Sequence, residues 1–281
     1  MASSISAAAW TFARRLTPAP LVPLARRLFN LMIANKDWTE QEELILHLIV
    51  PRNRGSVDVG ANLGSYTRRL SKLTPFVHAY EPDTQTAQLL QSAGLPNVTV
   101  HNKAVSDEIG QINYRVPIVD GHRVVSIAAV AKTFNGKEFN GKEFVEQKVP
   151  KTTLDKLADE DIGFVKIDVE GHELEVLNGA RRLFREQQPI VLIEAEDKHR
   201  SNAVNDVKEY FRSIDYDGLF IYERTAHAIS ELTPKMTDTR ELNRPVARVE
   251  QGYVNNFFFF PTHESAVHAA GVLNAYFQSE Q

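Results

Sequence analysis

The chain has 281 residues, 43% of them hydrophobic, which is enough for one large domain with a substantial core. Its formal net charge of -4 gives no indication of a general affinity for polyanions such as nucleic acids. The absence of cysteine excludes disulfides, thiolate nucleophiles and cysteine-bound metals, and it fits a reducing compartment, so we expect a cytoplasmic protein.

The N-terminal region is basic. Residues 1–36 contain no acidic residue, and we expect a helical extension with a basic face over residues 1–45. The bias of its start toward Ser, Ala and Arg is also typical of an organellar transit peptide. A third interpretation places LARRLFNLMIANK on an acidic membrane surface. No apolar run reaches the roughly 20 residues that a bilayer-spanning helix needs, so no transmembrane segment is expected.

From residue 55 onward, short apolar strands alternate with amphipathic helices. The predicted strands are 55–60, 76–81, 97–102, 163–168, 189–196, 218–223 and 255–261, and the predicted helices are 65–73, 83–94, 172–184, 205–214 and 263–277. This alternation predicts a parallel sheet with helices on both faces. Four consecutive phenylalanines, 257–260, predict a strand covered on both faces, because neighbouring side chains on a strand point to opposite sides.

The alternation is interrupted in the middle of the chain. Residues 110–117 and 144–150 alternate apolar and polar side chains as antiparallel strands do. Between them, NGKEF occurs twice in tandem at 135–144, which we interpret as a duplicated surface insertion. Residues 224–253 are polar and irregular, and a stretch of that length is typical of a lid or a mobile loop.

The glycine-containing turn in VDVGANLGSYT (57–67) joins a strand to a helix, where small cofactors bind in parallel sheets. Gly60 lets the backbone approach a ligand, and Gly64 lets the helix start close to the strand. The turn lacks the G-x-G-x-x-G dinucleotide pattern, and Asp58 would repel a diphosphate. Glu81, at the end of the next strand, can accept both hydroxyls of a ribose. A single nucleoside with a positive group is therefore expected, and S-adenosylmethionine meets that description.

Acidic residues follow the strand that ends FVKID. Asp168 and Glu170 lie where ligands of open sheets bind, and either carboxylate can take a proton from an acceptor hydroxyl. Glu170 has an alternative role at the start of a helix, where an acid satisfies free N–H groups. We expect the buried Lys166 to pair with a carboxylate such as Glu194, and we interpret His172 as a surface histidine.

The acidic residues between 168 and 199 also suggest a metal site. Asp168, Glu170, Glu194, Glu196 and His199 carry donor atoms that can bind Mg²⁺. No tight ligand motif connects them, so we predict no metal.

Six motifs carry a resemblance to a known family. VDVGANLGSYT, YEPD, NKAVSDEIG, TTLD, KIDVEGHE and IEAE occur in the order found in FkbM-type S-adenosylmethionine-dependent methyltransferases, and the chain resembles that family over residues 40–261. The resemblance implies an α/β, Rossmann-like class I methyltransferase fold with a seven-stranded, mostly parallel sheet and helices on both faces. A reversed last hairpin would place 255–261 between its neighbours. We expect a methyltransferase domain over 46–262, after the 1–45 extension, and a C-terminal helix over 263–281 packed on that domain.

The resemblance also implies the binding site. The backbone around 60–62 would meet the methionine part of the cofactor, Glu81 would hold the ribose, Lys103 and Ala104 would flank the adenine, and Asp168 would face the amino group or the acceptor. The predicted cofactor-binding residues are Asp58, Gly60, Ala61, Asn62, Gly64, Glu81, Lys103, Ala104 and Asp168. The predicted catalytic residues are Asp168, Glu170 and Lys166.

The expected reaction is O-methylation of a sugar, glycan or secondary metabolite. The first alternative keeps the fold and methylates an amide or amine nitrogen. A nicotinamide-dependent oxidoreductase is disfavoured by the missing G-x-G-x-x-G, and a cofactor-binding module without catalysis is disfavoured by the acids after the fourth strand. The sequence names neither the acceptor nor the oligomeric state.

Overall fold

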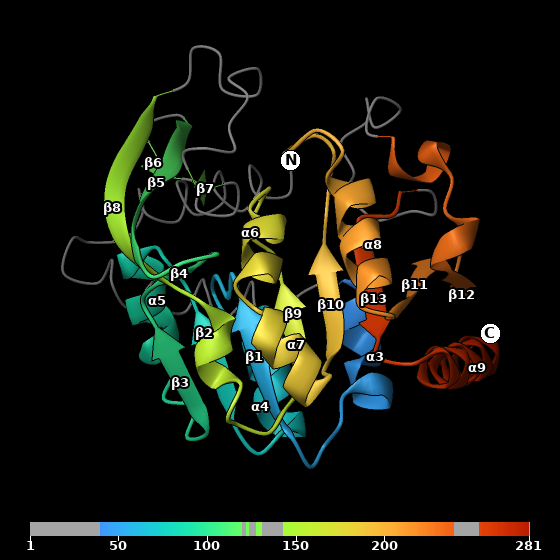
Figure 1. Cartoon of the computed structure of the whole chain (residues 1–281). Coiled ribbons are helices and arrows are strands. Elements are labelled where there is room, and N and C mark those ends of the chain that lie inside the picture. The colour runs from blue at the N-terminus through green and yellow to red at the C-terminus, as the bar shows by residue number, and fades with distance from the viewer. Residues whose placement is uncertain (1–39, 120–121, 124–127, 131–142, 239–252, 281) are drawn as a thin grey trace, which may run out of the picture.

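The computed structural model describes residues 40–119, 122–123, 128–130, 143–238 and 253–280. Within these ranges the main sheet has eight strands (Figure 1). In spatial order they are β12 (Thr225–Ala228), β11 (Asp217–Tyr222), β13 (Asn256–Phe260), β10 (Ile190–Glu194), β9 (Ile162–Ile167), β1 (Gly55–Val59), β2 (Val77–Tyr80) and β3 (Val98–His101). The strands from β10 to β3 are parallel, and β13 runs antiparallel between β10 and β11. The predicted Rossmann-like fold, including its reversed last strand, is confirmed.

The sheet has one strand more than the seven we expected. β12 pairs antiparallel with β11 and lies in the stretch that we predicted to be irregular. The turn between them holds Glu223 and Arg224 at φ of 48° and 56°. Hairpin turns with two such residues usually carry Asn-Gly or Asp-Gly, and this chain has neither there, so no hairpin signal was present.

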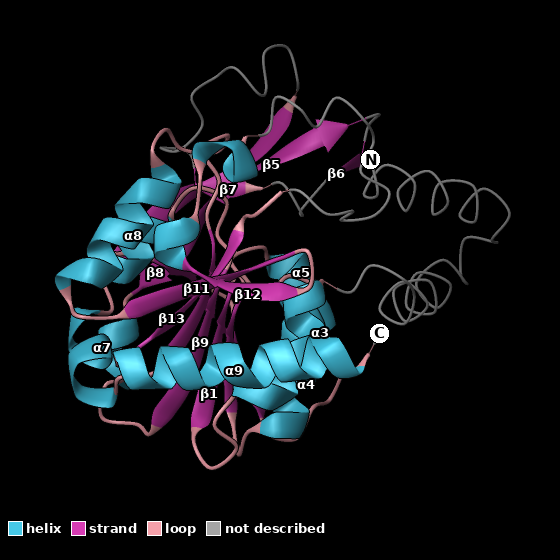
Figure 2. Ribbon diagram, turned by 90° about the vertical axis from the view of Figure 1, so that its right-hand side faces the viewer, coloured by secondary structure: helices cyan, strands magenta, loops and turns pink. Residues whose placement is uncertain are grey.

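Helices cover both faces of the sheet. Figure 2 shows α7 and α8 on one side of the strands and α3, α4 and α5 on the other. The helices are α3 (Gln41–Ile49), α4 (Ser65–Leu73), α5 (Thr84–Gln91), α6 (Glu173–Asn178), α7 (Arg181–Gln187), α8 (Ala203–Ser213) and α9 (His263–Ser279), with short 3-10 turns η3 (Leu154–Leu157), η4 (Ile229–Glu231) and η5 (Pro234–Thr237). Phe257 and Phe259 pack into the core with α6–α8, whereas Phe258 and Phe260 pack into the core with α3, α4 and α9. The prediction of a strand covered on both faces is confirmed.

The predicted helix 172–184 is wrong as one element, because the structure breaks it into α6 and α7 at Gly179. A Cβ atom on Gly179 would lie 2.0 Å from the carbonyl oxygen of Ser106, so only glycine lets the two backbones come this close. The break brings the chain after β3 against the start of α6, which forms part of the site described below.

A second, small sheet lies above the carboxyl edge of the main sheet (Figure 1). It contains β4 (Ala104–Val105), β5 (Gly110–Val119), β6 (His122–Arg123), β7 (Ala129–Val130) and β8 (Phe144–Thr152). β5 and β8 are antiparallel along their length, as predicted. Gln147 of β8 donates from Nε2 to Oδ2 of Asp83 at 3.3 Å and so connects this sheet to the turn before α5.

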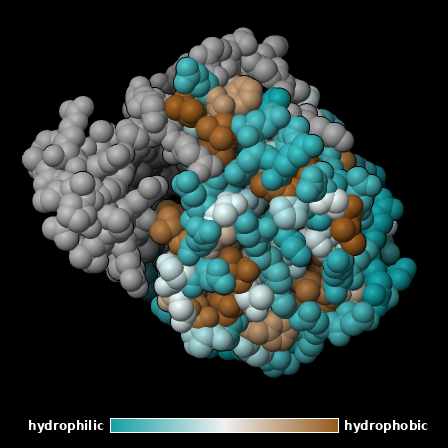
Figure 3. All heavy atoms as spheres, turned by 90° about the vertical axis from the view of Figure 1, so that its left-hand side faces the viewer, coloured by the Kyte–Doolittle hydropathy of each residue, from teal (hydrophilic) through white to brown (hydrophobic). Residues whose placement is uncertain are grey.

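Three sequence-based expectations lie largely or wholly outside the described residues: the N-terminal extension, the NGKEF repeat and much of the irregular stretch before residue 253. None of the helices in the described ranges combines the length and apolar character needed to cross a bilayer. The face seen in Figure 3 is mostly hydrophilic, with apolar side chains dispersed among polar ones.

Candidate cofactor and methyl-transfer site

A pocket lies at the carboxyl edge of the main sheet and is closed on one side by the small sheet. Its walls come from the turn after β1, the end of β2, the chain after β3, the turn after β9, and from Tyr114, Ala128 and Val130 of the small sheet region. Six of the predicted cofactor residues line it, namely Gly60, Asn62, Glu81, Lys103, Ala104 and Asp168. Glu170 lines it as well.

Gly60 holds the floor of the pocket in a conformation that suits glycine. Its φ is 80°, and a Cβ atom there would lie 1.7 Å from the carbonyl oxygen of Asp168. The backbone N–H of Asp168 donates to the oxygen of Val59 at 2.9 Å, so the ends of β1 and β9 are held together at this point. Gly64, at φ 84°, precedes α4 and lies against Leu90 rather than in the pocket.

Glu81 is a buried carboxylate at the end of β2, with 3% of its surface exposed. Its Oε2 accepts the backbone N–H of Asn62 at 2.8 Å, and its Oε1 accepts that of Asp83 at 2.7 Å. Burial raises the pKa of Glu81 to about 8, and the two backbone hydrogen bonds offset this only in part. Each oxygen keeps a further lone pair, so the group can still accept hydroxyl donors from a ligand.

Asp58 does not line the pocket. It is buried below the glycine turn, where Oδ2 accepts the hydroxyl of Thr67 at 2.5 Å and thereby ties α4 to β1. Burial raises the pKa of Asp58 to about 6. Ala61 and Gly64 are also absent from the pocket wall.

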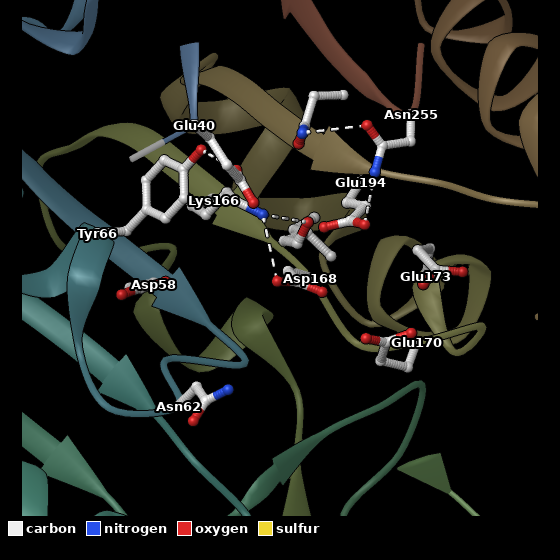
Figure 4. A network of polar contacts seen from close by, with 12 residues as sticks. Glu40, Asp58, Asn62, Tyr66, Lys166, Asp168, Glu170, Glu173, Glu194 and Asn255 are labelled. Atoms are coloured by element: carbon white, nitrogen blue, oxygen red, sulfur yellow. Dashed lines mark hydrogen bonds and ion pairs between the residues drawn. The ribbon is translucent and has the colours of Figure 1, made fainter. Parts of the chain in front are cut away.

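Lys166 is 1% exposed and lies beneath the pocket rather than in its wall. Its Nζ is 3.8 Å from Oδ2 of Asp168 and lies over the ring of Tyr66 at 4.9 Å (Figure 4). Lys166 thus pairs with a carboxylate, as expected, but the nearest one is Asp168. Glu194 adds to the negative charge around Lys166 and accepts the side-chain amide of Asn255 at 2.7 Å. Residues 166 and 168 share one face of the chain, as positions two apart on a strand do, which explains the observed pair.

Glu170 lies at the mouth of the pocket in a strained turn, with φ at 52°. Its Oε2 is 2.6 Å from Nε2 of His199, a contact that no sequence pattern indicated. Within the described part of the chain, no group of three or more histidine and carboxylate side chains has the geometry of a metal site.

His172 is buried, so the expectation of a surface histidine is wrong. It is 3% exposed, it lines the pocket, and its Nε2 lies 3.0 Å from the hydroxyl of Ser106. Glu173, beside it, is buried too and accepts the backbone N–H of Gly171 at 2.7 Å. Burial raises the pKa of Glu173 to about 7. The burial of His172 depends on the approach of the segment around Ser106 to α6, which no local pattern reveals.

The charge balance of the site fits a cationic ligand. Partial burial raises the pKa values of Asp168, Glu170 and Glu194 (Figure 4), and the side chains of Asp168 and Glu170 keep 35% and 20% of their surface exposed. A positive ligand would stabilise their ionised forms, whereas a diphosphate would be repelled. S-adenosylmethionine carries a sulfonium and an ammonium group, and the close backbone approach at Gly60 and the buried acceptor Glu81 fit its amino acid and ribose parts.

The strand order of the main sheet and the pocket at its carboxyl edge are those of a Rossmann-like α/β fold. A sequence model described as "Methyltransferase FkbM domain" matches residues 58–217, which is more than half of the chain. The chain therefore belongs to the FkbM methyltransferase family, and S-adenosylmethionine is its cofactor. A comparison with curated proteins gave no match.

Several solved structures have a similar arrangement. One is a methyltransferase FkbM from Methylobacillus flagellatus, at 20% identity and a TM-score of 0.47, covering 89% of this chain and 57% of that one. This chain thus spans little more than half the length of that protein. Another is a precorrin-6y C5,15-methyltransferase from Geobacter metallireducens, at 14% identity and a TM-score of 0.42, covering 79% and 90%. A third is a Streptococcus mutans protein described as a methyltransferase in complex with SAH, at 11% identity and a TM-score of 0.42, covering 80% and 98%.

Proposed function

We propose that the protein transfers the methyl group of S-adenosylmethionine to a hydroxyl group of a sugar, glycan or secondary metabolite. The observation that carries this proposal is the pair of carboxylates, Asp168 and Glu170, that the turn after β9 contributes to the pocket wall. A hydroxyl must lose its proton as it is methylated, and a positioned carboxylate can take it. The absence of cysteine supports a cytoplasmic location for this activity.

The positions of the pocket residues support an assignment of the cofactor contacts. The backbone at 60–62 would hold the methionine part, Glu81 the ribose hydroxyls, and Lys103 with Ala104 the adenine, since all three places line one pocket. Asp168 would hold the ammonium group, and Lys166, 3.8 Å behind it, keeps that carboxylate in place. Asp58, Ala61 and Gly64 would act through the shape of the turn.

The chemical step assigned to the chain is a proton transfer. When bound, S-adenosylmethionine would supply an electrophilic methyl group to the acceptor oxygen and would leave as S-adenosylhomocysteine. Glu170 takes the hydroxyl proton as the oxygen–carbon bond forms. Burial raises the pKa of Glu170, which brings this carboxylate nearer to the pKa of an effective general base at neutral pH. The walls hold the acceptor in place, and orientation supplies much of the rate acceleration.

The test measures release of S-adenosylhomocysteine from S-adenosylmethionine with a panel of free sugars, glycosides and phenols as acceptors. We expect Glu170→Gln to lower kcat by about 10²- to 10⁴-fold and to leave the affinity for S-adenosylhomocysteine within a few-fold of wild type. Glu209→Gln, an exposed acid on α8, is the matched control and should have no effect. A Glu170→Gln variant that retains its rate on an amine acceptor would favour N-methylation, because nitrogen acceptors often need only positioning.

A further inference from the structure

A chain of polar contacts runs from the pocket wall into the protein behind it. Glu170 contacts His199 Nε2 at 2.6 Å, and the same nitrogen is 3.8 Å from Oε1 of Glu196. Glu196 in turn accepts the hydroxyl of Tyr253 at 2.5 Å and pairs with Lys198 Nζ at 2.5 Å. The members come from the ends of β9 and β10 and from the chain entering β13, three neighbouring strands, so the sheet itself brings them together.

The backbone is adapted to the contact between Glu170 and His199. Glu170 has a φ of 52°, a conformation that is unfavourable for a non-glycine residue and persists where its surroundings fix it. Gly171 follows at φ 96°, and a Cβ atom there would lie 3.2 Å from Cβ of His199. The two residues together turn the chain so that the Glu170 side chain reaches His199 while still lining the pocket.

The surroundings of His199 favour its protonated form. Burial alone lowers its pKa, but the contacts with the carboxylates of Glu170 and Glu196 raise it to about 10. Asp168, at the end of β9, and Glu173, on α6, add negative charge, whereas Lys198 opposes protonation. Glu196 is held ionised: burial would raise its pKa, but its bonds to His199, Lys198 and Tyr253 outweigh this and leave the pKa lowered.

We propose that His199 is a positioning residue for methyl transfer, whose imidazolium ring, anchored by Glu196, fixes the orientation of the Glu170 carboxylate and keeps it ionised until the acceptor proton arrives. The inference rests on the proposed function, in which Glu170 takes that proton. His199 itself neither gains nor loses a proton in the step. It counteracts the effect of burial on Glu170, because a positive ring beside the carboxylate stabilises the charged form.

The first experiment measures the protonation state of His199 without turnover of substrate. The protein is labelled with ¹³C and ¹⁵N in its nine histidines, and each ring is titrated by NMR from pH 5 to 10. The signal missing in His199→Gln identifies the residue. We expect His199 to stay protonated through pH 8 in the wild type, and Glu170→Gln and Glu196→Gln each to lower its pKa by one unit or more. The proposal is overturned if His199 titrates between pH 6 and 7 in the wild type, or if its pKa is the same in Glu170→Gln as in the wild type.

The second experiment measures the effect of His199 on catalysis. Rates with S-adenosylmethionine and the best acceptor of the panel are measured from pH 6 to 10 for wild type, His199→Gln, Glu170→Gln and the double variant. His199→Gln should shift the acidic limb of the kcat profile to higher pH by about one unit. At a pH below that limb this is a loss of about tenfold in rate, and KM for S-adenosylmethionine should be unchanged. The double variant should be no slower than Glu170→Gln, because His199 acts through Glu170.

The outcomes separate this inference from the proposed function. A uniform loss of rate at every pH, or a raised KM with an unmoved acidic limb, would assign His199 a structural role only and overturn the inference alone. A wild-type protein that fails to bind S-adenosylhomocysteine in titration calorimetry overturns the proposed function, and this inference with it.

Discussion

Substitution of Glu81 by Gln tests the ribose contact through its dependence on pH. In the cofactor-free protein, burial raises the pKa of Glu81 to about 8, so the carboxyl is mostly protonated at pH 6 and about half ionised at pH 8. Ribose hydroxyls donate hydrogen bonds, and the ionised carboxylate accepts them best. Binding therefore selects the ionised form, and affinity should rise with pH until the pH exceeds the pKa.

The size of the effect follows from the ionised fraction. That fraction rises from about 1% at pH 6 to about 50% at pH 8, so the affinity for S-adenosylhomocysteine should improve by up to about 50-fold over that interval. In Glu81→Gln the dependence should be flat, because the amide does not titrate. At pH 8 the variant should bind roughly 10- to 100-fold more weakly, the value of a lost hydrogen bond to a charged group.

The assay is isothermal titration calorimetry with S-adenosylhomocysteine at pH 6, 7 and 8, for wild type, Glu81→Gln and the exposed control Glu209→Gln. Titration of the ligand's own amino group affects all three proteins alike and cancels in the comparison. Urea denaturation of each protein confirms that the variant is folded, since Gln leaves one of two backbone N–H donors facing an amide NH₂. Parallel pH dependences in wild type and Glu81→Gln would refute the reasoning.

Three further substitutions test the framework of the site by urea denaturation. Gly60→Ala places a Cβ atom 1.7 Å from the Asp168 carbonyl oxygen at a φ of 80°, and should cost at least about 2 kcal/mol of unfolding free energy and abolish S-adenosylhomocysteine binding. Phe258→Ala, at 0% exposure, should cost about 3–5 kcal/mol; a loss below 1 kcal/mol would contradict its place in the core. Thr67→Val removes the hydroxyl that Asp58 accepts and should cost about 1–3 kcal/mol. Because the pKa of Asp58 is about 6 and the bond favours its ionised form, this loss should be larger at pH 8 than at pH 5.

Features that depend on local pattern could be predicted from the sequence. The strand–glycine–helix order placed Gly60 in a turn at a strand end, and the next strand end placed Glu81 beside it. Parallel strands end at the same edge, so residues far apart in the chain meet there without further information. The run of four phenylalanines predicted a two-sided strand because side chains alternate along any strand.

Features that depend on contacts between distant segments could not be predicted in this way. His172 is buried because Ser106, 66 residues away, lies against it, and α6 ends because Gly179 faces the same segment. The pairing of Glu170 with His199 depends on two loops meeting above β9 and β10. None of these contacts produces a periodicity or a residue spacing that can be recognised in a single sequence.

The small sheet begins and ends at one place. Its first strand, β4, pairs side by side with the last residues of β8, Ala104 with Lys151 and Val105 with Thr152. The chain between these two points thus leaves and rejoins the main fold at neighbouring residues. A change in its length does not require a change in the pairing of β4 with β8. The tandem NGKEF copy falls in sequence within that interval. A stretch taken from a relative and exchanged between residues 107 and 150 would therefore replace Tyr114, Ala128 and Val130 in the pocket wall, while Gly60, Glu81 and Asp168 stay on the main sheet.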